Sequence, residues 1–216
     1  MTSGVTLDDI KGNAPDDQKQ MCIGVLDFYS SLKDHFAYSV GQRLKLLEVS
    51  VGPMINKKSQ AIVVCEISLE DDMLNLLGTL HGGCTAYVVG PCFACSSIAI
   101  AIAPQGVNNP EEWWGKVSVS QALNVLYHAP ARSGTTLRIV SETIVLGGRA
   151  GTIRCEVSTF ISDQINSCYT LARCIVNRDA NTWFFVAGVE RSAREYSEFA
   201  KDKAHSTSVT GAYFCT

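Results

Sequence analysis

The segment from Asn75 to Ala86 has the residue types and spacing most suited to chemistry: Asn-Leu-Leu-Gly-Thr-Leu-His-Gly-Gly-Cys-Thr-Ala. Gly82 and Gly83 allow the backbone to approach a ligand closely, and they open a long apolar run that predicts a helix. The first N–H groups of a helix have no partner within it and lie at the positive end of its dipole. The segment therefore predicts an oxyanion hole for a carbonyl oxygen under attack.

Neighbouring side chains are candidates for the same chemistry. Asn75 can hold a water molecule through its amide, and His81 can donate a hydrogen bond or fix the loop. Cys84 would lie in the first helical turn, where the dipole lowers a thiol pKa, so it is either a nucleophile or a small core residue. The three acidic residues at 70–72 are either a solvated turn or the source of a catalytic carboxylate.

The elements that must position these residues follow from hydrophobic periodicity. Residues 1–14 are polar and predict a frayed end, and the apolar spacing after Pro15 predicts an amphipathic helix closed by Gly41. Residues 82–103 predict a helix buried on most sides, with a kink or break near Gly90-Pro91 because proline removes a hydrogen bond. Strands are predicted over residues 44–51, 60–69, 116–127, 136–146, 151–161 and 167–177.

This element order predicts an α+β fold in which an antiparallel sheet wraps around one long central helix. Residues 1–41 form an N-terminal extension, 42–178 the main domain and 179–216 a C-terminal extension. One face of such a sheet stays partly open, so pairing with a second copy would bury what remains. We expect a homodimer or homotetramer.

Composition excludes several function classes. The 18 basic and 21 acidic residues give a net charge of −3, which offers no footprint for nucleic acid. No apolar run is long enough to span a bilayer, and the first residues lack a signal pattern, so we expect a cytoplasmic protein. The nine cysteines and four histidines show neither a disulfide framework nor a metal spacing. We expect no metal and no cofactor.

The segment from Asn75 to Ala86 resembles the signature of hotdog-fold acyl-CoA thioesterases of the phenylacetyl-CoA thioesterase type. In that signature an Asn, a G-T-x-H-G-G turn and a helix follow one another, and the runs 117–120 and 129–131 are similar to the family's next landmarks. The resemblance covers roughly residues 42–178 and implies a hotdog fold acting on acyl-CoA.

The resemblance also implies roles for individual residues. Asn75 would position the water or the substrate, His81 would support the loop, and the Gly82 N–H would bind the thioester oxygen. Ser120 would lie near the attacking water, although a cross-strand hydroxyl pair is an equal interpretation. The residues expected to line the substrate site are Gly83, Cys84 and Gly90.

One position departs from the family pattern. The acidic residue that the family carries nine positions after the histidine is Gly90 in this chain. Loss of a general base typically costs about 10²–10⁴ in rate. Three hypotheses follow: a thioester hydrolase with another arrangement, a non-hydrolytic binder of acyl thioesters, or an enzyme for another reaction such as dehydration or cyclisation.

Overall fold

The structure is a computed structural model that describes residues 5–177 apart from 32, 35, 54–58, 103–118, 148–149 and 162–163. The predicted C-terminal extension, 179–216, lies outside the described residues. The elements in chain order are η1 (Leu7–Asp9), α1 (Asp16–Ser31), α2 (Tyr38–Gly41), β1 (Lys45–Pro53), β2 (Ser59–Ser68), η2 (Asp71–Met73), α3 (Gly82–Ile102), β3 (Val119–Tyr127), β4 (Thr136–Leu146), β5 (Ala150–Ile161) and β6 (Gln164–Asn177).

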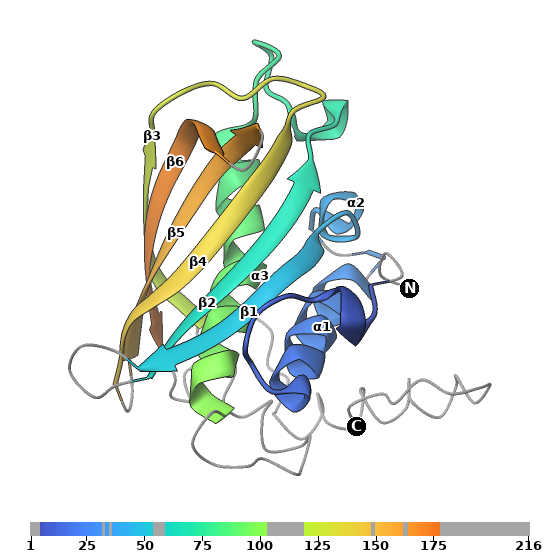
Figure 1. The fold of residues 1–216 in the computed structure, drawn as a ribbon. Helices are drawn as coiled ribbons and strands as arrows, with labels where there is room; N and C mark the ends of the chain where they lie inside the picture. Colours follow the sequence, from blue (N-terminus) through green and yellow to red (C-terminus); the bar gives the residue numbers. More distant parts are fainter. Residues whose placement is uncertain are drawn as a thin grey trace.

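The six strands form one antiparallel sheet in the order β1-β2-β4-β5-β6-β3. Figure 1 shows this sheet curving around α3, with α1 beside β1. The predicted architecture of an antiparallel sheet wrapped around a long helix is therefore confirmed, and the six predicted strands agree with the observed ones to within about three residues where both are described.

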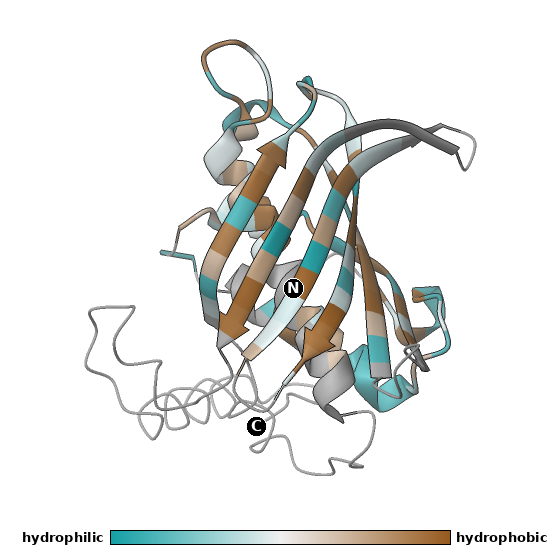
Figure 2. Cartoon of the chain, turned by 90° about the vertical axis from the view of Figure 1, so that its left-hand side faces the viewer, coloured by the Kyte–Doolittle hydropathy of each residue, from teal (hydrophilic) through white to brown (hydrophobic). Residues whose placement is uncertain are grey.

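Alternation along the strands explains why one face of the sheet is core. On β5, Ile153, Cys155 and Val157 are fully buried, whereas Arg154 between them is exposed. Such a period of two places alternate residues on opposite faces. Figure 2 shows the resulting alternation of hydrophobic and hydrophilic bands along the strands. The buried face packs on α3 through residues such as Val88 and Ala99.

Sequence analysis predicts a kink or a break near Gly90-Pro91; of these two alternatives the break is wrong, because α3 is continuous from Gly82 to Ile102. Proline inside a helix costs about 3 kcal/mol through a lost hydrogen bond and a backbone clash. Buried side chains lie on both sides of Pro91: Val88 and Val89 before it, Cys95 and Ala99 after it. Their packing against the sheet and α1 holds both halves in one helix.

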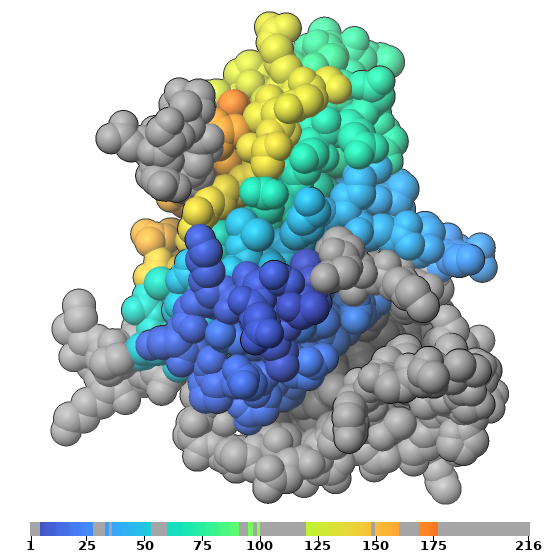
Figure 3. Space-filling view, turned by 45° about the vertical axis from the view of Figure 1, so that its right-hand side comes forward, coloured from blue at the N-terminus to red at the C-terminus, as the bar shows by residue number. Residues whose placement is uncertain are grey.

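The prediction of a frayed N-terminal end is also wrong for the described residues from Val5 onward. Lys11 N–H donates to the Leu47 carbonyl at 2.9 Å, and Val49 N–H donates to the Lys11 carbonyl at 3.0 Å. Ile10 and Ala14 are buried. Figure 3 shows these N-terminal residues, in dark blue, lying against the rest of the fold. The outer edge of β1 supplies backbone hydrogen-bond partners for this N-terminal segment. The polar composition of the segment did not predict them.

The helix predicted to end at Gly41 is divided in two. α1 ends at Ser31, and Ala37, in the left-handed region at φ 55°, precedes the short α2. Phe36 lies in the connection between α1 and α2 and is 79% exposed, with its ring against Tyr87 of α3. The division lets α2 approach the loop that leads into α3.

Candidate active site at the start of α3

The loop between β2 and α3 is a small, tightly bonded hairpin. Asn75 N–H donates to the Thr79 carbonyl at 2.8 Å, and Gly78 N–H donates to the Asn75 carbonyl at 3.0 Å. Gly78 adopts φ +70°, which favours glycine at this turn. Leu80 N–H donates to the Ala131 carbonyl at 2.8 Å, so the hairpin is also fixed to the connection between β3 and β4.

The Asn75 side chain holds this turn together. Its Oδ1 accepts from the N–H groups of Leu77 at 2.9 Å and Thr79 at 3.3 Å, and its Nδ2 donates to Thr79 Oγ1 at 2.9 Å. An amide nitrogen carries two hydrogens, so one Nδ2 hydrogen remains beyond the bond to Thr79. Asn75 therefore stabilises the loop and has one side-chain N–H that forms no bond to the described protein groups.

His81 immediately precedes α3 and caps it. Its Nδ1 accepts from the Gly83 N–H at 3.0 Å, and its carbonyl accepts from the Thr85 N–H at 3.0 Å. A side chain at the N-cap satisfies one of the free N–H groups of a helix in this way. The Gly83 N–H is thus already bonded to His81, so the predicted oxyanion hole has one donor fewer.

Two N–H groups at this helix end keep their donors free. Within the described part of the chain, no hydrogen bond joins the N–H of Gly82 or of Cys84 to another protein group. Gly82 is half-buried and Gly83 is exposed, so the helix end lies near the surface. The Gly82 N–H therefore has no acceptor among the described protein groups, and its role as an oxyanion donor stays a prediction.

Tyr127, at the end of β3, lies against Gly82 and was not identified from the sequence. Its hydroxyl donates to the Gly82 carbonyl at 3.0 Å, and a Cβ on Gly82 would lie 2.9 Å from the tyrosine oxygen. An alanine at position 82 would therefore displace the exposed Tyr127 side chain from its present position. The two residues are 45 positions apart, so only the tertiary fold brings them together.

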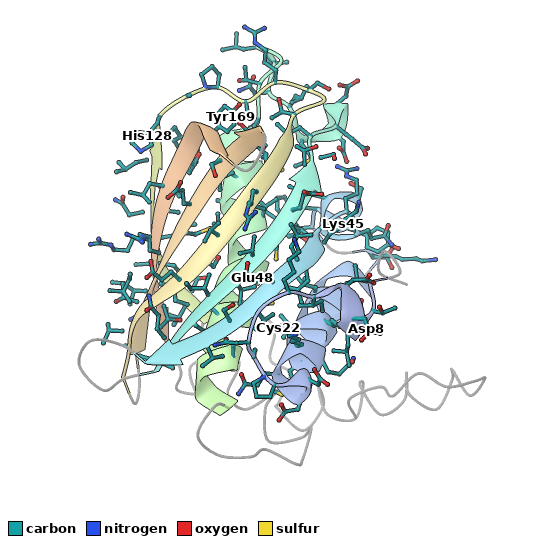
Figure 4. All side chains as sticks on the ribbon, in the orientation of Figure 1. Asp8, Cys22, Lys45, Glu48, His128 and Tyr169 are labelled. Carbon is teal, nitrogen blue, oxygen red and sulfur yellow. The ribbon has the colours of Figure 1, made fainter. Side chains whose placement is uncertain are left out.

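His128 and Tyr169 flank the same end of the sheet, as Figure 4 shows. His128 N–H donates to the Tyr169 carbonyl at 2.8 Å, and the His128 side chain is exposed. This bond continues the β3–β6 pairing beyond Tyr127 and fixes the end of β3 beside α3.

Cys84 is not poised as a nucleophile. Burial, together with the nearby Asp72 carboxylate, raises the pKa of the Cys84 thiol to about 11. The helix dipole, expected to lower the pKa, is outweighed because the thiol packs against the core. The interpretation of Cys84 as a small packing residue is the one that the structure favours.

The acidic residues at 70–72 brace the loop. Arg43 Nη2 pairs with Asp72 at 2.6 Å, Arg43 Nη1 pairs with Glu70 at 3.0 Å, and Ser133 Oγ donates to Asp71 at 2.9 Å. The Arg43 hydrogen bond holds the pKa of Asp72 below its usual value. These contacts favour the interpretation of the acidic run as a structural turn.

Gly90 and Ser120 lie far from Gly82 within one copy. Gly90 is eight residues along α3, which corresponds to about 12 Å of helix. Ser120 is at the opposite end of β3 from Tyr127, about 20 Å along the strand. A Cβ on Gly90 would meet no atom within 4 Å, so the position can accept a side chain. A single copy of the chain therefore does not bring Gly82, Gly90 and Ser120 together.

A bulge in β3 puts Ser120 and Asn124 on different faces. A regular period of two would place both on one face, but the register shifts between Ser120 and Ala122. Ser120 lies opposite the buried Val176, whereas Asn124 lies opposite the exposed Arg173. Cross-strand partners share a face, so Ser120 is on the helix side, where Cys174 Sγ donates to its Oγ at 3.4 Å.

The described residues contain no group of three or more His, Cys, Asp or Glu side chains that could hold a metal ion. Within the same residues, no helix is long and apolar enough to cross a membrane.

Comparisons with known proteins agree with this geometry. The thioesterase superfamily model matches residues 77–160, which include the hairpin turn, the start of α3 and β3 to β5. Zebra fish thioesterase superfamily member 2 superposes with a TM-score of 0.52 at 20% identity, covering 71% of this chain and 94% of that one. The fold is the hotdog thioesterase fold.

Further similarities lie within the hotdog thioesterases. A hypothetical thioesterase from Streptococcus pneumoniae, crystallised with coenzyme A, superposes with a TM-score of 0.51 at 14% identity over 70% of this chain and 92% of that one. Human acyl-coenzyme A thioesterase 13 is 31% identical over 85 residues, 39% of this chain and 52% of that protein. The chain spans about half the length of the curated relatives it matches.

Proposed function

We propose that this hotdog protein hydrolyses acyl-CoA thioesters at the start of α3. The observation that carries the proposal is the free N–H of Gly82 at the positive end of a 21-residue helix, within the segment that the thioesterase superfamily model matches. A thioester oxygen that accepts from this N–H would be stabilised as its negative charge develops. The second N–H of Asn75 Nδ2 is the donor that would position the attacking water or the substrate.

The proposed active unit is a homodimer formed through the outer edge of β3. Within the described residues no strand pairs with that edge, and Leu123 and Leu126 are 39% and 52% exposed on it. Antiparallel pairing of two copies about Leu123, the middle of β3, would bring Ser120 of a second copy opposite Leu126, next to Tyr127. The proposed site would then join the Gly82 N–H of one copy with Ser120 and Gly90 of the other.

Release of free CoA thiol from a panel of acyl-CoAs of increasing chain length tests the activity. We expect turnover above background that falls about 10- to 100-fold in Gly82→Ala, because the added methyl group displaces Tyr127 and moves the N–H. Gly24→Ala is the matched control, since a Cβ on this α1 glycine meets no atom within 4 Å. A folded wild-type protein with no turnover on any acyl-CoA would refute the hydrolase.

A non-hydrolytic acyl-thioester binder is the second candidate. It is favoured by the lack of a carboxylate at position 90 and by the engagement of all three residues at 70–72 in loop-bracing contacts. Calorimetry that detects acyl-CoA binding without release of CoA would support it. Another reaction on a bound thioester would instead yield a product that mass spectrometry distinguishes from a free acid.

The variant Gly90→Asp separates the two candidates. The open space at Gly90 should accept the side chain without displacing a neighbour. A rise in hydrolysis of about 10²-fold or more would mean that the carboxylate was the missing component of an otherwise intact site. An unchanged rate, with acyl-CoA binding retained, would favour the binder. Gly90→Asn is the matched control because it has a similar size and no charge.

A further inference from the structure

Two hydrogen bonds act on opposite sides of one peptide group at the start of α3. Tyr127 Oη–H donates to the Gly82 carbonyl at 3.0 Å, and the Gly83 N–H donates to His81 Nδ1 at 3.0 Å. The Gly82 carbonyl and the Gly83 N–H belong to the same planar peptide unit. Hydrogen bonds in such a chain polarise and strengthen one another. Tyr127 and His81 are therefore coupled through the backbone between them.

This chain of hydrogen bonds also determines which ring nitrogen of His81 carries the proton. A neutral imidazole has one N–H and one acceptor nitrogen. Because Nδ1 accepts from Gly83, the proton is on Nε2, and no hydrogen bond joins Nε2 to a protein group in the described part of the chain. The His81 side chain is exposed. The ring thus presents a free Nε2–H beside the helix end.

We propose that Tyr127 is a positioning residue that holds His81 as a neutral Nε2–H donor next to the free Gly82 N–H. It acts through the Gly82–Gly83 peptide, not by touching the reacting atoms. The donation to the Gly82 carbonyl makes the Gly83 N–H a better donor to Nδ1, which restrains the ring. The catalytic consequence rests on the proposed thioester hydrolysis, whereas the coupling itself belongs to the ligand-free protein.

Tyr127→Phe isolates the hydroxyl. The phenyl ring can still lie against Gly82, and Tyr127 is 57% exposed, so the variant is not expected to unfold the chain. Tyr169→Phe is the matched control: it removes a tyrosine hydroxyl at the same end of the sheet, where the contact is Thr159 Oγ1 at 3.5 Å.

Nuclear magnetic resonance of the ligand-free protein tests the coupling directly. In the wild type we expect a scalar coupling across the hydrogen bond between the Gly83 ¹⁵N and the His81 ¹⁵Nδ1. Tyr127→Phe should weaken that coupling and accelerate exchange of the Gly83 N–H about 3- to 10-fold, as expected for one lost neutral hydrogen bond. Tyr169→Phe should leave both unchanged. Unaltered coupling and exchange in Tyr127→Phe would overturn the proposal.

Kinetics then separate positioning from substrate contact. Tyr127→Phe should lower kcat about 3- to 10-fold with KM unchanged, whereas a residue that only binds substrate would raise KM. A change confined to KM would contradict the positioning role. If the wild type hydrolyses no acyl-CoA, the proposed function fails, and the resonance measurements still decide whether Tyr127 controls His81.

Discussion

The two edges of the sheet differ in what covers them. The outer edge of β1 is paired with the chain's own N-terminal residues, through Lys11 and through Asn13, whose side chain bonds both the N–H and the carbonyl of Val51. The outer edge of β3 has no such partner among the described residues, and it carries exposed leucines. An unpaired, apolar edge is a template for strand pairing, so the difference favours the β3 side as the interface of the proposed homodimer.

The covered side also reaches the candidate site. From the β1 edge the chain continues through α1 and α2 to Arg43, which pairs with Asp72 in the loop before α3. Ser39 of α2 donates to the same carboxylate at 2.8 Å. The β1 side of the molecule therefore braces the loop from within the chain, whereas the β3 side is where the proposed second copy would bind.

The largest expected effect comes from a charge on the open edge. Leu123→Lys should weaken self-association by about 100-fold or more, because an unpaired charge would be buried in the strand interface. Analytical ultracentrifugation over a concentration series measures the shift. Ser50→Lys, on the covered side of the sheet, should leave the dimer intact. Equal dimerisation by wild type and Leu123→Lys would mean that β3 is not the interface.

Opening the covered edge should be nearly as costly. Gly12 has φ +98°, and a Cβ there would lie 2.1 Å from the Val49 carbonyl oxygen, so Gly12→Ala must push the N-terminal segment away from β1. We expect a loss of about 2–3 kcal/mol in the free energy of unfolding, measured by urea denaturation. Gly52→Ala, with no atom near its Cβ, is the control. Equal stability of the two variants would mean that the segment around Gly12 does not pack tightly against β1.

The link from the covered side to the loop predicts a smaller, pH-dependent effect. Asp72→Asn should cost about 1 kcal/mol at pH 7, since the pair with Arg43 is partly exposed. The folded-state pKa of Asp72 is lowered from 3.8, so its contribution is present above that value and is lost as the pH falls through the folded pKa. The gap between wild type and variant should therefore close on acidification. A gap that stays constant down to pH 2 would contradict the assignment.

The smallest effect is expected for Asn13→Ala. The substitution removes two partly exposed hydrogen bonds to Val51, at 2.7 and 2.9 Å, while leaving the backbone pairing of Lys11 in place. We expect a loss of about 0.5–1 kcal/mol by thermal or urea unfolding. A loss as large as that of Gly12→Ala would mean that the side chain, and not the backbone, holds the segment.

The strands could be predicted because burial of one sheet face requires alternating apolar residues, as in Ile153, Cys155 and Val157. The long helix could be predicted because it is buried on most sides and its sequence is a continuous apolar run. The pairing of residues 10–14 with β1 could not be predicted, because it uses backbone N–H and carbonyl groups, which nearly every residue carries whatever its side chain. The continuity of α3 through Pro91 depends on packing with distant strands, which local propensity does not include.

The candidate site was predictable in part for the same reason. The free Gly82 N–H could be predicted because the first N–H groups of any helix lack partners within it. The contact between Tyr127 and Gly82 could not, because it joins residues 45 positions apart. The face of Ser120 depends on a bulge with no local signal. Asn75 was expected to serve a ligand, but most of its hydrogen-bonding capacity goes to its own turn.

The pairing of Lys11 with β1 has a consequence for stoichiometry. A sheet that offers one edge can be lengthened once, and the resulting pair has no second edge of that kind left. In the proposed homodimer, strand addition would therefore end at two chains, and an open-ended polymer would require the N-terminal segment to detach first. A segment that belongs to no strand would thus limit the size of the proposed assembly.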